Sequence, residues 1–130
     1  MTAKMDNSFI NFVDFIDVSM DAYDTAPKAL FEKMMRMLIS TFHTQEVDLE
    51  KQVLAVDEMN VIPVDDLDAF YDSMLNTLDD VKLFKKKIAP LVSKDALFVE
   101  LDSQLDKLHT MFVQYMDAMG QLEVRLLQSA

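Results

Sequence analysis

Cysteine is absent from this chain, and glycine and proline are scarce. Its 130 residues include one glycine and three prolines. Without cysteine the protein forms no disulfide, has no thiol nucleophile and offers no thiolate to a metal, a composition that suits a reducing cytoplasm. So few turn-forming residues also disfavour β-sandwiches, β-barrels and the glycine-rich loops that bind phosphate.

A long hydrophobic run is missing as well. The longest uncharged stretches are near MLISTFHTQ and LHTMFVQYM, and they reach about half of the roughly 18 residues that a membrane span needs. No basic segment followed by an apolar one opens the chain, so we expect no signal peptide. We predict a single cytoplasmic domain over residues 1–130 that does not contact a membrane.

Acidic residues outnumber basic ones along the whole chain. There are 23 Asp and Glu against 12 Lys and Arg, which gives a formal net charge of −11. A uniformly negative field repels phosphate backbones and anionic lipid, and it attracts basic groups. We therefore expect no direct contact with nucleic acid, and a protein partner that is basic or has an exposed apolar segment.

Apolar residues recur at helical spacing nearly everywhere, and no alternating strand pattern is present. The spacing predicts helices over about 8–24 and 27–59, a third from Leu67 that ends before Pro90, and a fourth after an N-cap at Ser93. The predicted fold is all-α, an antiparallel bundle of about four helices. At a rise of 1.5 Å per residue the second and fourth helices are each roughly 50 Å long.

Some helix ends and one possible kink stay open at this level. Asn7 or Ser8 suits the N-cap of the first helix, and Asp65 or Asp66 suits that of the third. The polar residues around His43 weaken the apolar pattern of the second helix, so it is either continuous or kinked there.

The first predicted helix carries a single line of carboxylates on an otherwise apolar surface. Spaced by three, four and three residues, they are Asp14, Asp17, Asp21 and Asp24. We call this line the acidic row. It is either the one solvated edge of a helix that is packed on its other sides, or a strip that binds basic groups of a partner. Its side chains are too far apart on a rigid helix to chelate one metal ion.

The last predicted helix has two apolar lines. The main line repeats like a heptad from Leu97 to Leu126. The second line, which we call the α4 line, consists of Val113, Met116, Gly120, Val124 and Leu127. One neighbouring helix cannot cover both lines, so we predict a homodimer through the α4 line. The alternative is a last helix that lies at the centre of its own bundle.

The only glycine and the methionines support a contact surface on this helix. In mid-helix, Gly120 costs about 1 kcal/mol relative to alanine, and a close helix crossing would offset that cost. Methionine is flexible enough for surfaces that adapt to a partner, and it also fills irregular cores. The methionines form two clusters, which are Met34, Met35 and Met37 on the second helix and Met111, Met116 and Met119 on the fourth.

The sequence contains few residues in patterns that are typical of a catalytic or metal site. His109 follows Asp106 by three residues, which is half of the paired arrangement found in di-iron bundles; the other half is missing, so no metal is expected. In RMLISTFH, Arg36 and His43 resemble the Arg-x(4–6)-His motif of the HEPN helical ribonucleases. That resemblance implies a ribonuclease in which Arg36 and His43 act on RNA phosphates. Met37 stands where that family usually has a polar residue.

We therefore predict a non-enzymatic protein without a cofactor, which binds or restrains a protein partner. A secretion chaperone, an antitoxin or immunity protein, and an inhibitor all belong to this class. One alternative is a nucleic-acid mimic, in which the acidic row imitates a row of phosphates and blocks a DNA- or RNA-binding protein. Another is the HEPN-like ribonuclease.

Overall fold

The computed structural model describes residues 12–129, apart from the side chain of Val13. Within this range the chain forms helices joined by short connections, and no strand. The helices are α1 (Phe12–Thr25), α2 (Lys28–Asp57), α3 (Leu67–Val92) and α4 (Ala96–Gln128). The prediction of an all-α bundle is confirmed. With 30 and 33 residues, α2 and α4 are about 45 and 50 Å long.

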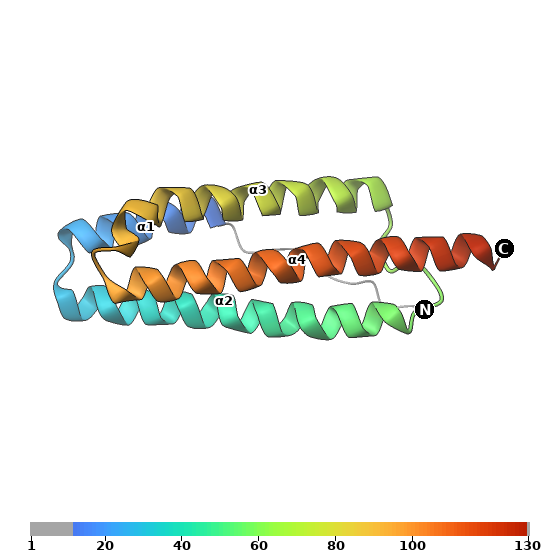
Figure 1. Ribbon diagram of the computed structural model, residues 1–130, viewed down its shortest axis with the longest axis horizontal. Coiled ribbons are helices and arrows are strands. Elements are labelled where there is room, and N and C mark those ends of the chain that lie inside the picture. The colour runs from blue at the N-terminus through green and yellow to red at the C-terminus, as the bar shows by residue number, and fades with distance from the viewer. Residues whose placement is uncertain (1–11, 130) are drawn as a thin grey trace.

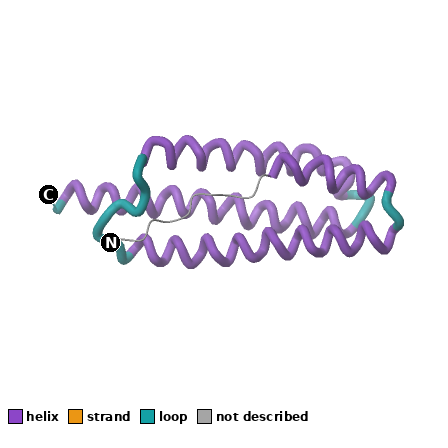
Figure 2. The backbone as a smooth tube through the Cα atoms, turned by 180° about the vertical axis from the view of Figure 1, so that it is seen from behind, coloured by secondary structure: helices purple, strands orange, loops and turns teal. Residues whose placement is uncertain are grey.

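Each helix runs opposite to the one before it, although chain neighbours are not always neighbours in space (Figure 1). α4 packs against α2 and α3, and α1 packs against α3 and α2. The closest pair, α2 with α4, runs in the same direction, as the view from behind also shows (Figure 2). The connection after α2 therefore crosses the end of the bundle to reach α3.

The main apolar line of α4 forms the centre of the core. Several of its side chains have no exposed surface, and they are Leu101, Leu105, Leu108, Phe112, Tyr115, Met119 and Leu122. Full burial of a leucine or phenylalanine side chain contributes about 1.5–3 kcal/mol. This line therefore accounts for a large share of the favourable burial, as its regular spacing predicts.

Aromatic rings connect all four helices at one level of the bundle. The ring of Phe42 on α2 lies 5.1 Å from that of Phe12, 5.9 Å from that of Phe15 and 6.0 Å from that of Phe84, between centroids. Phe12 also lies 6.2 Å from Phe112 on α4. Most of these pairs are edge to face, an arrangement that adds to the hydrophobic burial. This cluster fixes α1 against the three longer helices.

α2 is continuous, so the kink left open near His43 does not occur. Thr41 and Thr44 donate their hydroxyl groups to the backbone carbonyls of Met37 and Ser40, at 2.9 and 3.1 Å. These hydroxyl groups find acceptors on carbonyls of their own helix, so the polar residues are accommodated without an interruption of α2.

Two predicted helix boundaries are wrong. α3 continues through Pro90 to Val92, because a proline in the last turn removes only one donor from the helix. Ser93 is consequently the C-cap of α3 and not the N-cap of α4. Asp95 caps α4 instead, and its carboxylate accepts a hydrogen bond from the backbone N–H of Leu97 at 2.8 Å.

The other cap predictions have different outcomes. Asp66 caps α3, with its carboxylate 3.1 Å from the backbone nitrogen of Ala69. It is one of the two residues proposed from the sequence. Asn7 and Ser8 lie outside the described residues, as does the predicted start of the first helix.

Candidate functional site

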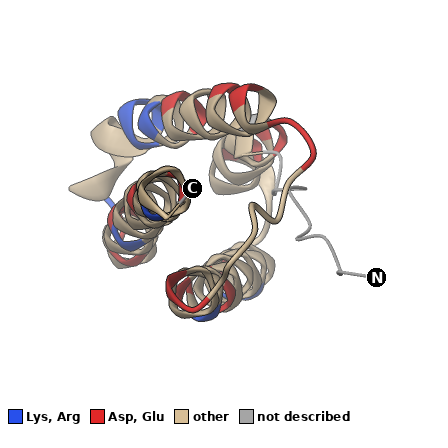
Figure 3. Ribbon diagram, turned by 90° about the vertical axis from the view of Figure 1, so that its right-hand side faces the viewer, with Lys and Arg blue, Asp and Glu red and all other residues tan. Residues whose placement is uncertain are grey.

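The acidic row lies on the outer side of α1. All four of its carboxylates are exposed, whereas Phe12, Ile16 and Ser19 on the opposite side are buried. The buried hydroxyl of Ser19 donates to the carbonyl of Ile16 at 2.9 Å. Acidic positions occur on every side of the bundle in the end view (Figure 3), which matches the even spread of charge along the chain.

The α4 line stays largely uncovered in the single chain. Val113, Val124 and Leu127 are 38%, 52% and 71% exposed, and Met116 and Gly120 are half-buried. The last turns of α4 extend past the ends of α2 and α3 (Figures 1 and 2), so the described helices do not cover the end of the line. Its role as an oligomer interface stays a prediction.

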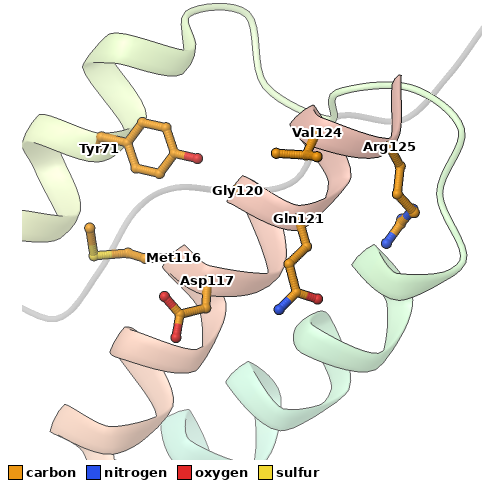
Figure 4. A pocket seen from close by; sticks show the side chains of 7 residues that line it. All are labelled: Tyr71, Met116, Asp117, Gly120, Gln121, Val124 and Arg125. Carbon is orange, nitrogen blue, oxygen red and sulfur yellow. The ribbon is translucent and has the colours of Figure 1, made fainter. Parts of the chain in front are cut away.

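A hollow of about 730 Å³ lies in the middle of the α4 line, between α3 and α4 (Figure 4). A Cβ atom on Gly120 would lie 3.6 Å from the hydroxyl oxygen of Tyr71, which is an ordinary contact distance. The packing of α3 on α4 therefore does not require a glycine. The missing side chain leaves the hollow open. Its lining residues are Tyr71, Met116, Asp117, Gly120, Gln121, Val124 and Arg125.

Charged groups surround this hollow. Burial raises the pKa of Tyr71, and so does the nearby Glu123 carboxylate, which accepts a hydrogen bond from the phenol. Asp117 adds a second exposed carboxylate. Arg125 donates to the carbonyl of Val56 in the last turn of α2 at 3.2 Å, and this carbonyl also accepts a hydrogen bond from the backbone N–H of Met59. The hollow thus combines the apolar side chains of Met116 and Val124 with the polar side chains of Asp117, Gln121 and Arg125.

The two residues of the HEPN-like motif are both exposed on α2. The Nδ1 atom of His43 lies 3.2 Å from the Oε1 atom of Glu46. That same oxygen accepts a hydrogen bond from the Nε2 atom of Gln104, at 2.9 Å. Arg36 lines a shallow hollow on the outer side of α2. The ribonuclease hypothesis stays untested by this geometry.

Asp106 and His109, the pair compared with the di-iron arrangement, both lie near lysine side chains of α3. The Asp106 carboxylate pairs with Lys85 of α3, whose Nζ atom also lies 3.8 Å from Asp102. The pKa of His109 is lowered by burial first and then by Lys82 and Lys85, against the opposing effect of Asp106. Within residues 12–129 no group of three or more His, Asp or Glu side chains is placed to hold a metal ion.

The structure also contains a groove that the sequence did not predict. It lies between α1 and α2 and has a volume of about 220 Å³. We call it the α1–α2 groove, and it is lined by Phe15, Val18, Met34, Met37, Leu38 and Thr41. The only sequence signal was the methionine cluster on α2. That cluster divides in the fold, since Met35 is fully buried while Met37 is 63% exposed.

The chain matches no protein-family model, no curated protein and no solved structure. The likeness to HEPN ribonucleases therefore rests on the spacing of Arg36 and His43 alone. None of the described helices is both long enough and apolar enough to cross a lipid bilayer.

Proposed function

We propose that this protein is a non-enzymatic, acidic helical protein of the cytoplasm that binds or restrains another protein. Secretion chaperones, antitoxins, immunity proteins and inhibitors work in this way. The α4 line carries the proposal, because an apolar line with an open hollow at its centre remains uncovered in the single chain. Exposed apolar residues grouped on one side of a helix are typical of protein contact sites.

The same line supports a homodimer. Two copies of α4 that cross near Gly120 would cover the line of each chain, and the hollow would admit a side chain of the partner. Met116 lies beside it and is flexible enough to adapt to that side chain. The acidic row would then steer a basic partner toward the dimer and repel acidic proteins.

A matched pair of variants tests the dimer. Val124 and Val99 both lie on α4 and are 52% and 49% exposed, but only Val124 belongs to the α4 line. Sedimentation velocity over a range of concentrations should show a dimer for the wild type and for Val99→Asp, and a monomer for Val124→Asp. A wild type that is monomeric throughout refutes the dimer and leaves the α4 line to a foreign partner.

The same variants test the binding function. Immobilised protein would be incubated with a lysate of the source cells, and the retained proteins identified by mass spectrometry. A specific partner should be retained by the wild type and by Val99→Asp, and lost with Val124→Asp. If no protein is retained above the background of an empty matrix, the binding function is refuted.

The exposure of all four carboxylates of the acidic row favours the nucleic-acid mimic as a second candidate. That hypothesis predicts that changing the whole row to asparagine abolishes partner binding while Val124→Asp preserves it.

The ribonuclease hypothesis has a direct test. Purified protein is incubated with RNA beside Arg36→Ala and His43→Ala, and cleavage that does not exceed that of the variants removes it.

A further inference from the structure

The α1–α2 groove has the shape and composition of a site for an apolar side chain. Leu38 forms its buried floor at 6% exposure, and Val18 and Met37 on its two sides are 50% and 63% exposed. Phe15 and Met34 are half-buried between them. Apolar grooves between two helices commonly bind an amphipathic helix, whose apolar residues enter the groove as anchors.

Charge differs between the two sides of the groove. On α1, Asp14 precedes Val18 by four residues and Asp21 follows it by three, so both carboxylates share a side of the helix with Val18. α1 has no basic residue at all. On α2, the exposed Lys33 precedes Met37 by four residues. The groove is therefore acidic along α1 and has a cation on its α2 side.

We propose that the α1–α2 groove binds an amphipathic helix of a foreign protein, with an apolar anchor beside Met37 and basic residues along the acidic row. The occupant is basic because the carboxylates of the acidic row, on a helix that has no basic residue, attract cationic side chains. This proposal rests on the proposed protein-binding function and names the chemistry of the partner.

The geometry of α1 sets the length and spacing of that helix. The described part of α1 has 14 residues and is about 21 Å long, so a partner segment of at least this length can lie along it. The row has steps of three, four and three residues, which are also the steps between side chains on one face of a facing helix. Met34 and Met37 are flexible enough to adjust to different anchors.

The test uses a synthetic peptide of about 16 residues with leucine at i, i+3, i+4 and i+7 and lysine along one flank. A peptide of the same composition in scrambled order is the control for non-specific attraction to an acidic protein. Methyl NMR spectra of protein with labelled methionines locate the binding. Met34 and Met37 report on the groove, Met116 on the hollow of α4, and the fully buried Met74 on the core.

The expected result is a set of shifts at Met34 and Met37 with the amphipathic peptide only, and weaker binding at higher salt. Met37→Glu should weaken binding by about tenfold or more, since it removes an apolar contact at the centre of the site. Asp14→Asn together with Asp21→Asn should weaken it by about fivefold. Leu75→Glu is the matched control, because Leu75 is 51% exposed on α3 and lies outside the groove.

Other results would overturn the proposal. Shifts at Met116 alone would place the peptide on α4, which refutes the groove and leaves the proposed function standing. Shifts at Met34 and Met37 when the protein alone is concentrated would make a second copy the occupant. Equal binding of the scrambled peptide, or no binding of either, would also refute the groove, while the sedimentation and capture experiments above decide the protein-binding function separately.

Discussion

Replacing Gly120 with alanine separates the packing within one chain from contact between chains. Glycine in a helix interior costs about 0.5–1 kcal/mol relative to alanine, because it loses more backbone freedom on folding. No glycine within the described residues has a positive φ, so the alanine needs no backbone change. Its Cβ would meet the Tyr71 hydroxyl at 3.6 Å, which is an ordinary contact. No clash therefore reduces the stability that is gained by replacing the glycine with alanine.

We expect Gly120→Ala to raise the free energy of unfolding by about 0.8 kcal/mol and the melting temperature by roughly 3–5 °C. Urea denaturation followed by circular dichroism gives the first quantity, at a protein concentration low enough for monomer to dominate. A destabilised monomer would refute the reasoning, since it would mean that Tyr71 needs the space that the glycine leaves.

The same variant has the opposite effect on association if a second copy packs on the α4 line. The added methyl group narrows the hollow at the expected crossing point, so the dimer should weaken several-fold while the monomer becomes more stable. Sedimentation equilibrium measures this change. A dimer of unchanged strength in Gly120→Ala would show that the two chains do not meet at the hollow, and Gly120→Leu should then have no effect on association either.

Three further predictions concern the stability of the single chain. Phe42→Ala should lower the free energy of unfolding by about 3–5 kcal/mol, whereas Leu127→Ala, at a position 71% exposed, should change it little; urea denaturation measures both. Burial lowers the pKa of His109 from 6.5, so as the pH falls the unfolded chain binds a proton on this side chain before the folded chain does. Stability therefore falls as the pH drops below about 6.5. His109→Gln should remove that part of the pH dependence in the same assay. Burial raises the pKa of Tyr115 from 10.0 to about 12, so stability is lost as the pH rises between these values; the tyrosinate absorbance of the wild type beside Tyr115→Phe checks this.

The parts of the fold that follow from local spacing could be predicted from the sequence. The heptad-like repeat from Leu97 to Leu126 identified the buried side of α4, because burial against neighbours follows the turn of a helix. The Asp66 cap followed from a proline-containing break and a nearby carboxylate. The boundary at Ser93 was harder, because Ser93 and Asp95 are both good N-caps. The choice between them depended on whether α3 stops at Pro90.

Contacts between distant segments could not be predicted in this way. Periodicity does not say which helix an apolar line will meet, so the parallel packing of α2 on α4 had no signal in the sequence. The α1–α2 groove could not be predicted from the sequence for the same reason. Val18 and Met37 each belong to an apolar stretch that reads as core, yet α1 and α2 approach each other without covering these two side chains. The acidic row could be recognised, but not its position beside a groove.

The two apolar surfaces lie far apart, and this has a consequence for binding. The α1–α2 groove is formed by α1 and the first half of α2, whereas the hollow lies in the last third of α4, and these segments are at opposite ends of the bundle (Figure 1). A dimer through the α4 line would therefore leave both grooves free. Two such sites on one particle bind a partner with two basic helices far more tightly than either site alone, provided that the helices can reach both. Calorimetric titration with the single amphipathic peptide should give one peptide per chain, at the same affinity for the wild type and for Val124→Asp. A groove affinity that falls with Val124→Asp would mean that the two surfaces are coupled and that the dimer forms part of the groove.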